Sequence, residues 1–171
     1  GKTTLAMAFS RALGLSYKRM QFNPDVMPSD ITGFSIYDQK TGSFRYQEGA
    51  VLCNLFLADE INRAGSRTQA ALLEAMEEGA VTVDGVTRPI PQPFAVIATQ
   101  NPTGSAGTQL LPDSQLDRFM LRFSLGYPSH DAEVELLRRK NEGNLQRARQ
   151  VVDAAALQQA QKQVRQVFIS P

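Results

Sequence analysis

A short apolar run that ends in two acids constrains the fold of this chain more than any other feature. Residues 54–58 read Asn-Leu-Phe-Leu-Ala, and Asp59 and Glu60 follow them directly. A nearly unbroken apolar run of this length is typical of a strand that is buried on both faces of a parallel sheet. The two carboxylates would then lie at the carboxyl edge of the sheet, where open α/β sheets bind their ligands.

Strands and helices alternate along the rest of the chain. Helices are expected at residues 4–13, at 66–78, from about 129 onward and at 153–167. Strands are expected at residues 17–22, 54–58 and 94–99, and residues 119–125 form a further apolar segment. This alternation indicates an α/β fold with a mostly parallel sheet.

Two hairpins are expected to interrupt the alternation. The first occupies residues 34–47, where two short strand patterns flank Gln-Lys-Thr-Gly. The second occupies residues 81–87, where Asp84 and Gly85 suit the positive φ angles of a type I′ turn.

The first four residues, Gly1, Lys2, Thr3 and Thr4, match the second half of the phosphate-binding loop G-x-x-x-x-G-K-[ST]. In that motif, backbone N–H groups and a helix N-terminus surround the phosphates. The lysine reaches the β- and γ-phosphates, and the hydroxyl that follows it binds Mg²⁺. Taken alone, these four residues favour an ordinary helix start, capped by Thr3 or Thr4.

Asp59 and Glu60, which follow the apolar run, make a phosphate-binding loop the better interpretation of the first four residues. Asp59 would help to hold the hydration shell of Mg²⁺, and Glu60 would orient and deprotonate the water that attacks the γ-phosphate. The alternative, in which both acids lie in the first turn of a helix, is disfavoured by Lys2 and Thr3 upstream. Asn101 ends the next strand at the same edge and could hydrogen-bond the water and a phosphate oxygen, although an Asn-Pro turn is the alternative.

Composition narrows the functional classes. The 18 basic residues nearly balance the 17 acidic ones, and the formal net charge of +1 predicts no strong field toward nucleic acid or membrane. No apolar stretch approaches the roughly 18 residues of a membrane span, and no leader is recognised, so a cytoplasmic setting is expected. The single cysteine, Cys53, lies in an apolar run and is expected to be a buried hydrophobe.

Together these motifs resemble the MoxR family of AAA+ ATPases along nearly the whole chain. The segments that carry the resemblance are residues 21–25, 28–33, 57–64, 68–76, 81–85, 98–102 and 115–119. The resemblance implies a P-loop NTPase core of three layers with a mostly parallel sheet. It also implies that the first strand, the front half of Walker A and the C-terminal helical lid with its sensor 2 arginine are missing. Residues 1–171 would therefore be a partial AAA+ core of a larger ATPase.

The resemblance also assigns roles to the residues. Lys2 and Thr3 belong to Walker A, Asp59 and Glu60 belong to Walker B, and Asn101 is sensor 1. ATP and Mg²⁺ are the implied cofactors. In the family's strand order, the strand before Walker A lies between the strand that ends at residue 101 and one that begins near residue 119. Without it, we expect the chain alone to bind ATP·Mg²⁺ weakly and to show no turnover.

Arg118 falls where the family places its arginine finger, which reaches the γ-phosphate of a neighbouring subunit in a ring. A local ion pair with Asp117, or one at the sheet edge, is the alternative. By the same resemblance, residues 34–47 match the helix-2 insert and residues 81–87 match the pre-sensor hairpin. Residues 153–167 would lead to the missing lid.

The implied function is ATP binding and hydrolysis by a ring, expected to be a hexamer, that remodels or matures client protein complexes. A von Willebrand A-type domain protein is an expected partner. A nucleic-acid motor of helicase or loader type is one alternative, but the hairpin tip at Asp84 and Gly85 lacks basic side chains to grip phosphates. A non-catalytic scaffold is the other alternative, and the intact set of catalytic side chains argues against it. A protein substrate is therefore favoured.

Overall fold

The computed structural model describes residues 2–101, 110–124, 126–141 and 148–167, so Gly1 lies outside the described part of the chain. In order, the elements are α1 (Lys2–Ala12), β1 (Tyr17–Gln21), α2 (Pro28–Thr32), β2 (Gly33–Asp38), β3 (Ser43–Glu48), β4 (Leu55–Asp59), the 3-10 turn η1 (Ile61–Arg63), α3 (Ser66–Glu78), β5 (Ala80–Val83), β6 (Val86–Pro89), β7 (Ala95–Ala98), α4 (Asp113–Leu116), α5 (His130–Asn141) and α6 (Ala154–Val164). No helix among the described residues is long and apolar enough to cross a membrane.

A parallel sheet in the order β1–β4–β7 forms the centre of the molecule. Leu55 of β4 pairs with Tyr17 of β1 on one side and with Ala95 of β7 on the other. Because β4 has a neighbour at each edge and a layer on each face, its first four residues are buried and only Asp59 is partly exposed. The prediction of a doubly buried strand that ends in acids is confirmed.

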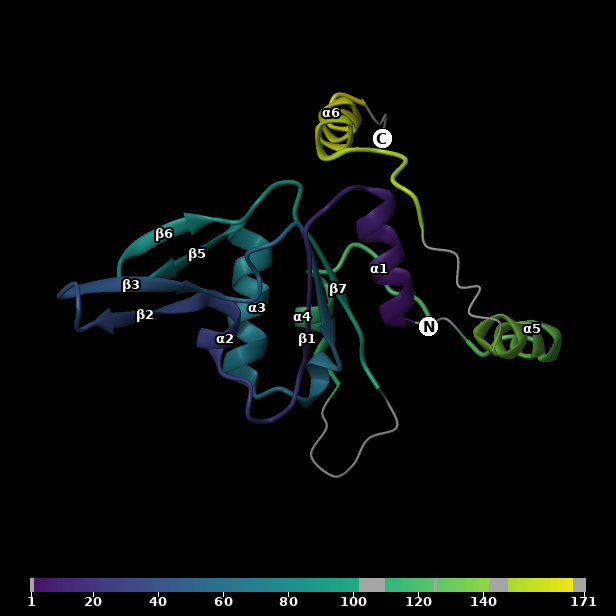
Figure 1. Ribbon diagram of the computed structural model, residues 1–171, viewed down its shortest axis with the longest axis horizontal. Coiled ribbons are helices and arrows are strands. Elements are labelled where there is room, and N and C mark those ends of the chain that lie inside the picture. Colours follow the sequence, from purple (N-terminus) through teal and green to yellow (C-terminus); the bar gives the residue numbers. More distant parts are fainter. Residues whose placement is uncertain (1, 102–109, 125, 142–147, 168–171) are drawn as a thin grey trace.

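Helices cover both faces of this sheet, with α1 on one side and α2 and α3 on the other (Figure 1). Side chains alternate across a strand, so β4 contributes to both interfaces. Five fully buried side chains form the centre of the core on the α2 and α3 side: Phe22, Ile31, Phe56, Ile61 and Leu72. Burying each side chain of this size stabilises the fold by about 1.5–3 kcal/mol. The result is the three-layer α/β arrangement expected from the sequence.

Two antiparallel hairpins, β2–β3 and β5–β6, lie side by side beyond α2 and α3 (Figure 1). At the tip of β5–β6, Asp84 and Gly85 have φ angles of 52° and 73°, as a type I′ turn requires. The guanidinium of Arg88 on β6 lies 3.8 Å from the ring centroid of Tyr46 on β3. This contact ties the two hairpins together.

The apolar segment that begins at Phe119 forms no strand over residues 119–124. The prediction of a strand that begins near residue 119 is therefore wrong. Its side chains at Met120, Leu121 and Phe123 are 97%, 80% and 72% exposed. A strand needs a neighbour to bond its backbone groups. Among the described residues, the only strand beside β7 is β4, so no ladder connects β7 to this segment. The resemblance predicts a further strand between β7 and this segment, and no strand among the described residues takes that place.

Candidate active site

Asp59 ends β4 at the carboxyl edge of the sheet, and both of its carboxylate oxygens are bonded. Arg19 on β1 places Nη2 2.7 Å from Oδ2, and the Thr99 hydroxyl donates to Oδ1. Burial raises the pKa of Asp59, but the bonds from Thr99 and Arg19 and the charges of Arg19 and Lys2 outweigh it, so the pKa lies below the ordinary 3.8. The carboxylate is therefore ionised at neutral pH, as a partner of hydrated Mg²⁺ must be.

Glu60 follows with its backbone in the left-handed region, at φ 56° and ψ 46°. Such a conformation costs about 1–2 kcal/mol for a residue other than glycine and is frequent at active sites. Three hydrogen bonds hold Glu60: its N–H donates to the Thr99 hydroxyl at 2.9 Å, its carboxylate accepts from the Arg63 guanidinium at 3.0 Å, and its carbonyl accepts from the Arg63 N–H at 2.9 Å. The Glu60 side chain is 25% exposed, so water can reach the carboxylate.

The N-terminal helix brings Lys2 to the same edge. The Lys2 Nζ donates to the backbone carbonyl of Gln100, at 3.3 Å, just beyond β7. The charge of Lys2 also helps to lower the pKa of Asp59, after the larger effects of burial, Thr99 and Arg19. Thr3 and Thr4 lie in the first turn of the same helix. Three separate segments, namely α1, the end of β4 and the end of β7, thus meet at one edge.

Asn101 stands two residues beyond Thr99 and is exposed. Its backbone N–H donates to Oδ1 of Asn62 at 3.3 Å, and its carbonyl accepts from Nδ2 of Asn62 at 3.2 Å. Asn62 belongs to η1, which directly follows Glu60. The chain after Glu60 and the chain after β7 are therefore bonded to each other.

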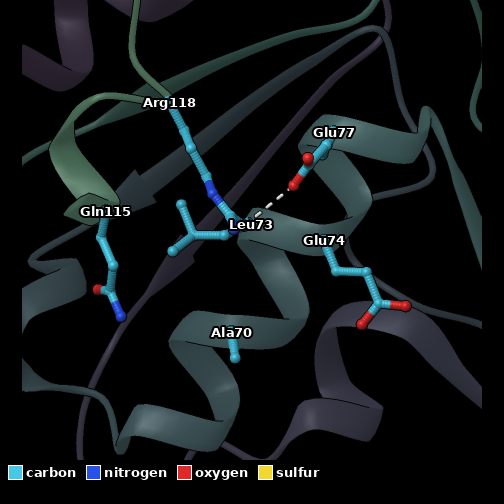
Figure 2. Close-up of a pocket in the computed structure, with 6 residues that line it drawn as sticks. All are labelled: Ala70, Leu73, Glu74, Glu77, Gln115 and Arg118. Carbon is cyan, nitrogen blue, oxygen red and sulfur yellow. Dashed lines mark ion pairs between the residues drawn. The ribbon is translucent and has the colours of Figure 1, made fainter.

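Arg118 lies in a different place, over α3 (Figure 2). Its Nη1 is 3.3 Å from Oε2 of Glu77, and the two side chains are 45% and 62% exposed. The ion pair is local, as one alternative from the sequence proposed, but the partner is Glu77 and not Asp117. An exposed pair of this kind contributes about 0–1 kcal/mol. Six residues, Arg118 among them, line a pocket here: Ala70, Leu73, Glu74, Glu77, Gln115 and Arg118.

Three side chains that shape the site were not predicted from the sequence: Arg19, Thr99 and Asn62. Arg19 and Thr99 are polar residues within strand patterns, and such a residue often faces a site at the end of the sheet. Asn62 lies within the segment 57–64 that carries the family resemblance. These are the signals by which the sequence could have pointed to them.

A family model described as the ATPase family associated with various cellular activities (AAA) matches residues 1–121. The match covers more than half of the chain and includes every residue of the candidate site. This chain belongs to the AAA ATPase family.

Within the AAA ATPases the chain is of the MoxR type. It is 46% identical over 138 residues to chaperone MoxR1 of Mycobacterium tuberculosis, covering 81% of this chain and 37% of that protein. It is 53% identical over 137 residues to uncharacterized protein YeaC of Bacillus subtilis, covering 80% of this chain and 43% of that protein. The chain thus spans about two fifths of the length of these relatives.

A solved structure supports the same fold. The crystal structure of a candidate ATPase from Cytophaga hutchinsonii is 38% identical and superposes with a TM-score of 0.87. The match covers 99% of this chain and 52% of that chain. This AAA ATPase core is therefore an α/β P-loop core.

The residues of the edge fit a nucleotide with Mg²⁺. Thr3 and Asp59 would hold the ion, because both offer oxygen ligands and the Asp59 carboxylate is kept ionised. Lys2 and the first turn of α1 would hold the phosphates. In the described part of the chain, no three acidic, histidine or cysteine side chains gather to hold a metal by themselves. In nucleotide sites Mg²⁺ generally takes one or two ligands from side chains and the others from phosphate oxygens and water.

Proposed function

We propose that this chain is the ATP-hydrolysing core of a ring-forming MoxR-type ATPase that remodels or matures protein complexes. The observation that carries the proposal is the meeting of Lys2, Asp59, Glu60 and Asn101 at one sheet edge. Their charges and hydrogen-bonding groups match the needs of phosphoryl transfer to water, which requires positioning and charge neutralisation more than covalent chemistry.

Each residue has a distinct task in this proposal. Lys2 would neutralise charge on the β- and γ-phosphates, and Asp59, beside Thr3, would hold the hydrated Mg²⁺. Glu60 takes a proton from the attacking water, since its carboxylate is reachable from solvent. Asn101 orients that water and a γ-phosphate oxygen. Mg²⁺, when bound, would spread the negative charge of the transferring group.

Arg118 is proposed to act on the site of a neighbouring subunit. Its pair with Glu77 is exposed and therefore weak, so a phosphate of the next subunit could take the guanidinium from it. This role requires a ring, which we propose to be a hexamer. We further propose that β2–β3 is the helix-2 insert, that β5–β6 is the pre-sensor hairpin and that α6 leads toward a helical lid.

The proposed substrate is a client protein complex in the cytoplasm, handled together with a von Willebrand A-type domain protein. One relative, MoxR1, is named a chaperone, and a chaperone acts on other proteins. This name supports a protein client. The charge at the tip of β5–β6 comes from Asp84, and Arg88 behind it is engaged with Tyr46. A groove for nucleic acid would need free cations there. Stimulation of the ATPase by single-stranded DNA would support the nucleic-acid motor instead.

The test is nucleotide binding and hydrolysis by the full-length protein that carries this chain. Lys2→Ala should weaken ATP binding about tenfold to a hundredfold, because it removes a charge-assisted bond to phosphate. Lys40→Ala, which removes the same charge from the turn of β2–β3, is the matched control and should leave affinity unchanged. Unchanged affinity in Lys2→Ala would contradict the assignment of the phosphate site.

We also infer that the 171 residues alone bind ATP·Mg²⁺ weakly and do not turn it over. Only the GKTT half of the phosphate loop belongs to this sequence, and most of the N–H groups that surround the phosphates come from the other half. Calorimetry on the 171-residue chain checks this inference. Tight, magnesium-dependent binding would show that the front half of the loop is dispensable.

A further inference from the structure

Asn62 is a buried polar residue at the candidate active site that has no role so far in the reaction. Its side chain is 3% exposed. Both polar ends of its amide hydrogen-bond the same partner, the backbone of Asn101, at 3.2 and 3.3 Å. A side-chain amide bonded in both directions to one residue fixes where that residue's backbone lies, as a strand partner would.

The backbone of Asn101 needs such a partner because the sheet ladder ends before it. The register of β4 with β7 stops at the pair Ala58 and Ala98. Two bonds extend it slightly, from Thr99 N–H to the Ala58 carbonyl and from Ile61 N–H to the Thr99 carbonyl. Asn101 lies two residues further on, where its backbone is bonded by the side chain of Asn62 instead of by a neighbouring strand.

Asn62 can hold Asn101 in place because its own turn is anchored. Ile61 beside it is fully buried in the core. The side chain of Gln69 on α3, itself 8% exposed, donates from Nε2 to the carbonyls of Ile61 at 3.2 Å and of Ala64 at 3.1 Å. The turn η1 is therefore fixed to the sheet on one side and to α3 on the other.

We propose that Asn62 is a positioning residue for hydrolysis, which fixes the backbone of Asn101 and so keeps the Asn101 amide at the carboxyl edge. This inference rests on the proposed function, in which Asn101 orients the attacking water. Asn62 follows Glu60 by two residues. One rigid turn therefore fixes the position of the proton acceptor, Glu60, relative to the Asn101 amide. A displacement of about 1 Å at such a group can cost about a hundredfold in rate.

The experiment is steady-state ATP hydrolysis by Asn62→Ala in the full-length protein. We expect kcat to fall about tenfold to a hundredfold, while KM for ATP stays within about threefold, because phosphate binding depends on Lys2 and α1. Asn62→Ser is the second variant, since its hydroxyl and a water can satisfy the buried backbone if the alanine variant does not fold. The same separation of kcat from KM is expected for it.

Asn54→Ala is the matched control. Asn54 also bonds backbone groups with both ends of its amide, accepting from Ser16 N–H and donating to the Pro93 carbonyl, but at the other end of β4. Its loss should lower the melting temperature without lowering kcat. A kcat loss in Asn54→Ala equal to that in Asn62→Ala would mean that both act through general stability, and the proposal would be overturned.

The combination with Asn101→Ala decides how Asn62 acts. On that background, Asn62→Ala should lower kcat by less than about twofold, because its effect has to pass through Asn101. The same factor on both backgrounds would overturn the proposal. If Asn62→Ala keeps the wild-type kcat while Asn101→Ala and Glu60→Gln do not, this inference fails and the proposed function stands. If Asn101→Ala keeps the wild-type kcat, the proposed role of Asn101 fails as well.

Discussion

At the scale of single residues, the chemistry of the edge depends on contacts between segments that are far apart in the sequence. Asp59 is held by Arg19 and Thr99, which lie 40 residues before and after it. The acids themselves could be predicted, because an apolar run that ends in carboxylates is a local pattern. Arg19 and Thr99 are recognisable as polar residues within strand patterns, but their bonds to Asp59 could not be predicted, because these depend on how β1 and β7 align with β4.

The pair of Arg19 and Asp59 makes a prediction about stability and pH. A carboxyl whose pKa is lowered by folding adds stability above its unfolded pKa, and that stability is lost as pH falls through the folded pKa. Arg19→Met should therefore destabilise the protein at pH 7 by about 1 kcal/mol or less, because Arg19 is 41% exposed and solvent screens the pair. This loss of unfolding free energy should shrink as pH falls below about 4, the ordinary aspartate pKa, because the unfolded chain binds a proton at Asp59 before the folded chain does.

Urea unfolding of Arg19→Met and of the wild type, at pH 7 and at pH 3, measures this loss of unfolding free energy. Arg45→Met, on the exposed strand β3, removes the same charge without touching Asp59 and is the control. A deficit in Arg19→Met that is equal at both pH values would show that Arg19 does not act through the Asp59 charge.

At the scale of elements, both hairpins and the central strand could be predicted, and the pairing of one segment could not. The Asp-Gly turn of β5–β6 follows from local conformational preference, and β4 follows from its apolar run. Residues 119–124 are also largely apolar, yet they form no strand. Apolar side chains permit a strand, but a strand forms only where the backbone groups of a neighbouring strand bond it.

The contact between the hairpins gives a prediction for Tyr46. Tyr46→Leu removes the ring under Arg88, and amides of β5–β6 should exchange up to about fivefold faster, since such contacts contribute about 0.5–1 kcal/mol. Tyr46→Phe keeps the ring and loses only the hydroxyl bond to the Thr32 carbonyl, so exchange in β5–β6 should not change. Hydrogen exchange on the full-length protein measures both. Equal acceleration in the two variants would assign the effect to the hydroxyl.

At the scale of the whole molecule, the proposal requires two subunits to complete one site. If Arg118 is an arginine finger, Arg118→Ala subunits should bind ATP but hydrolyse it about a thousandfold more slowly or worse. Mixing them with Glu60→Gln subunits should restore part of the activity, because an Arg118→Ala subunit keeps Glu60 and its Glu60→Gln neighbour supplies the arginine. Co-assembled mixtures that show no recovery at any ratio would make Arg118 a local structural residue paired with Glu77.

The central claim is that Glu60 activates the water that cleaves ATP, and Glu60→Gln in the full-length protein tests it most directly. The amide nearly matches the carboxylate in shape but cannot take a proton, so the variant should bind ATP within about threefold of the wild type while turnover falls about a hundredfold or more. Binding is measured with a fluorescent ATP analogue and turnover by phosphate release on the same preparation. Steady-state hydrolysis at the wild-type rate would contradict the claim.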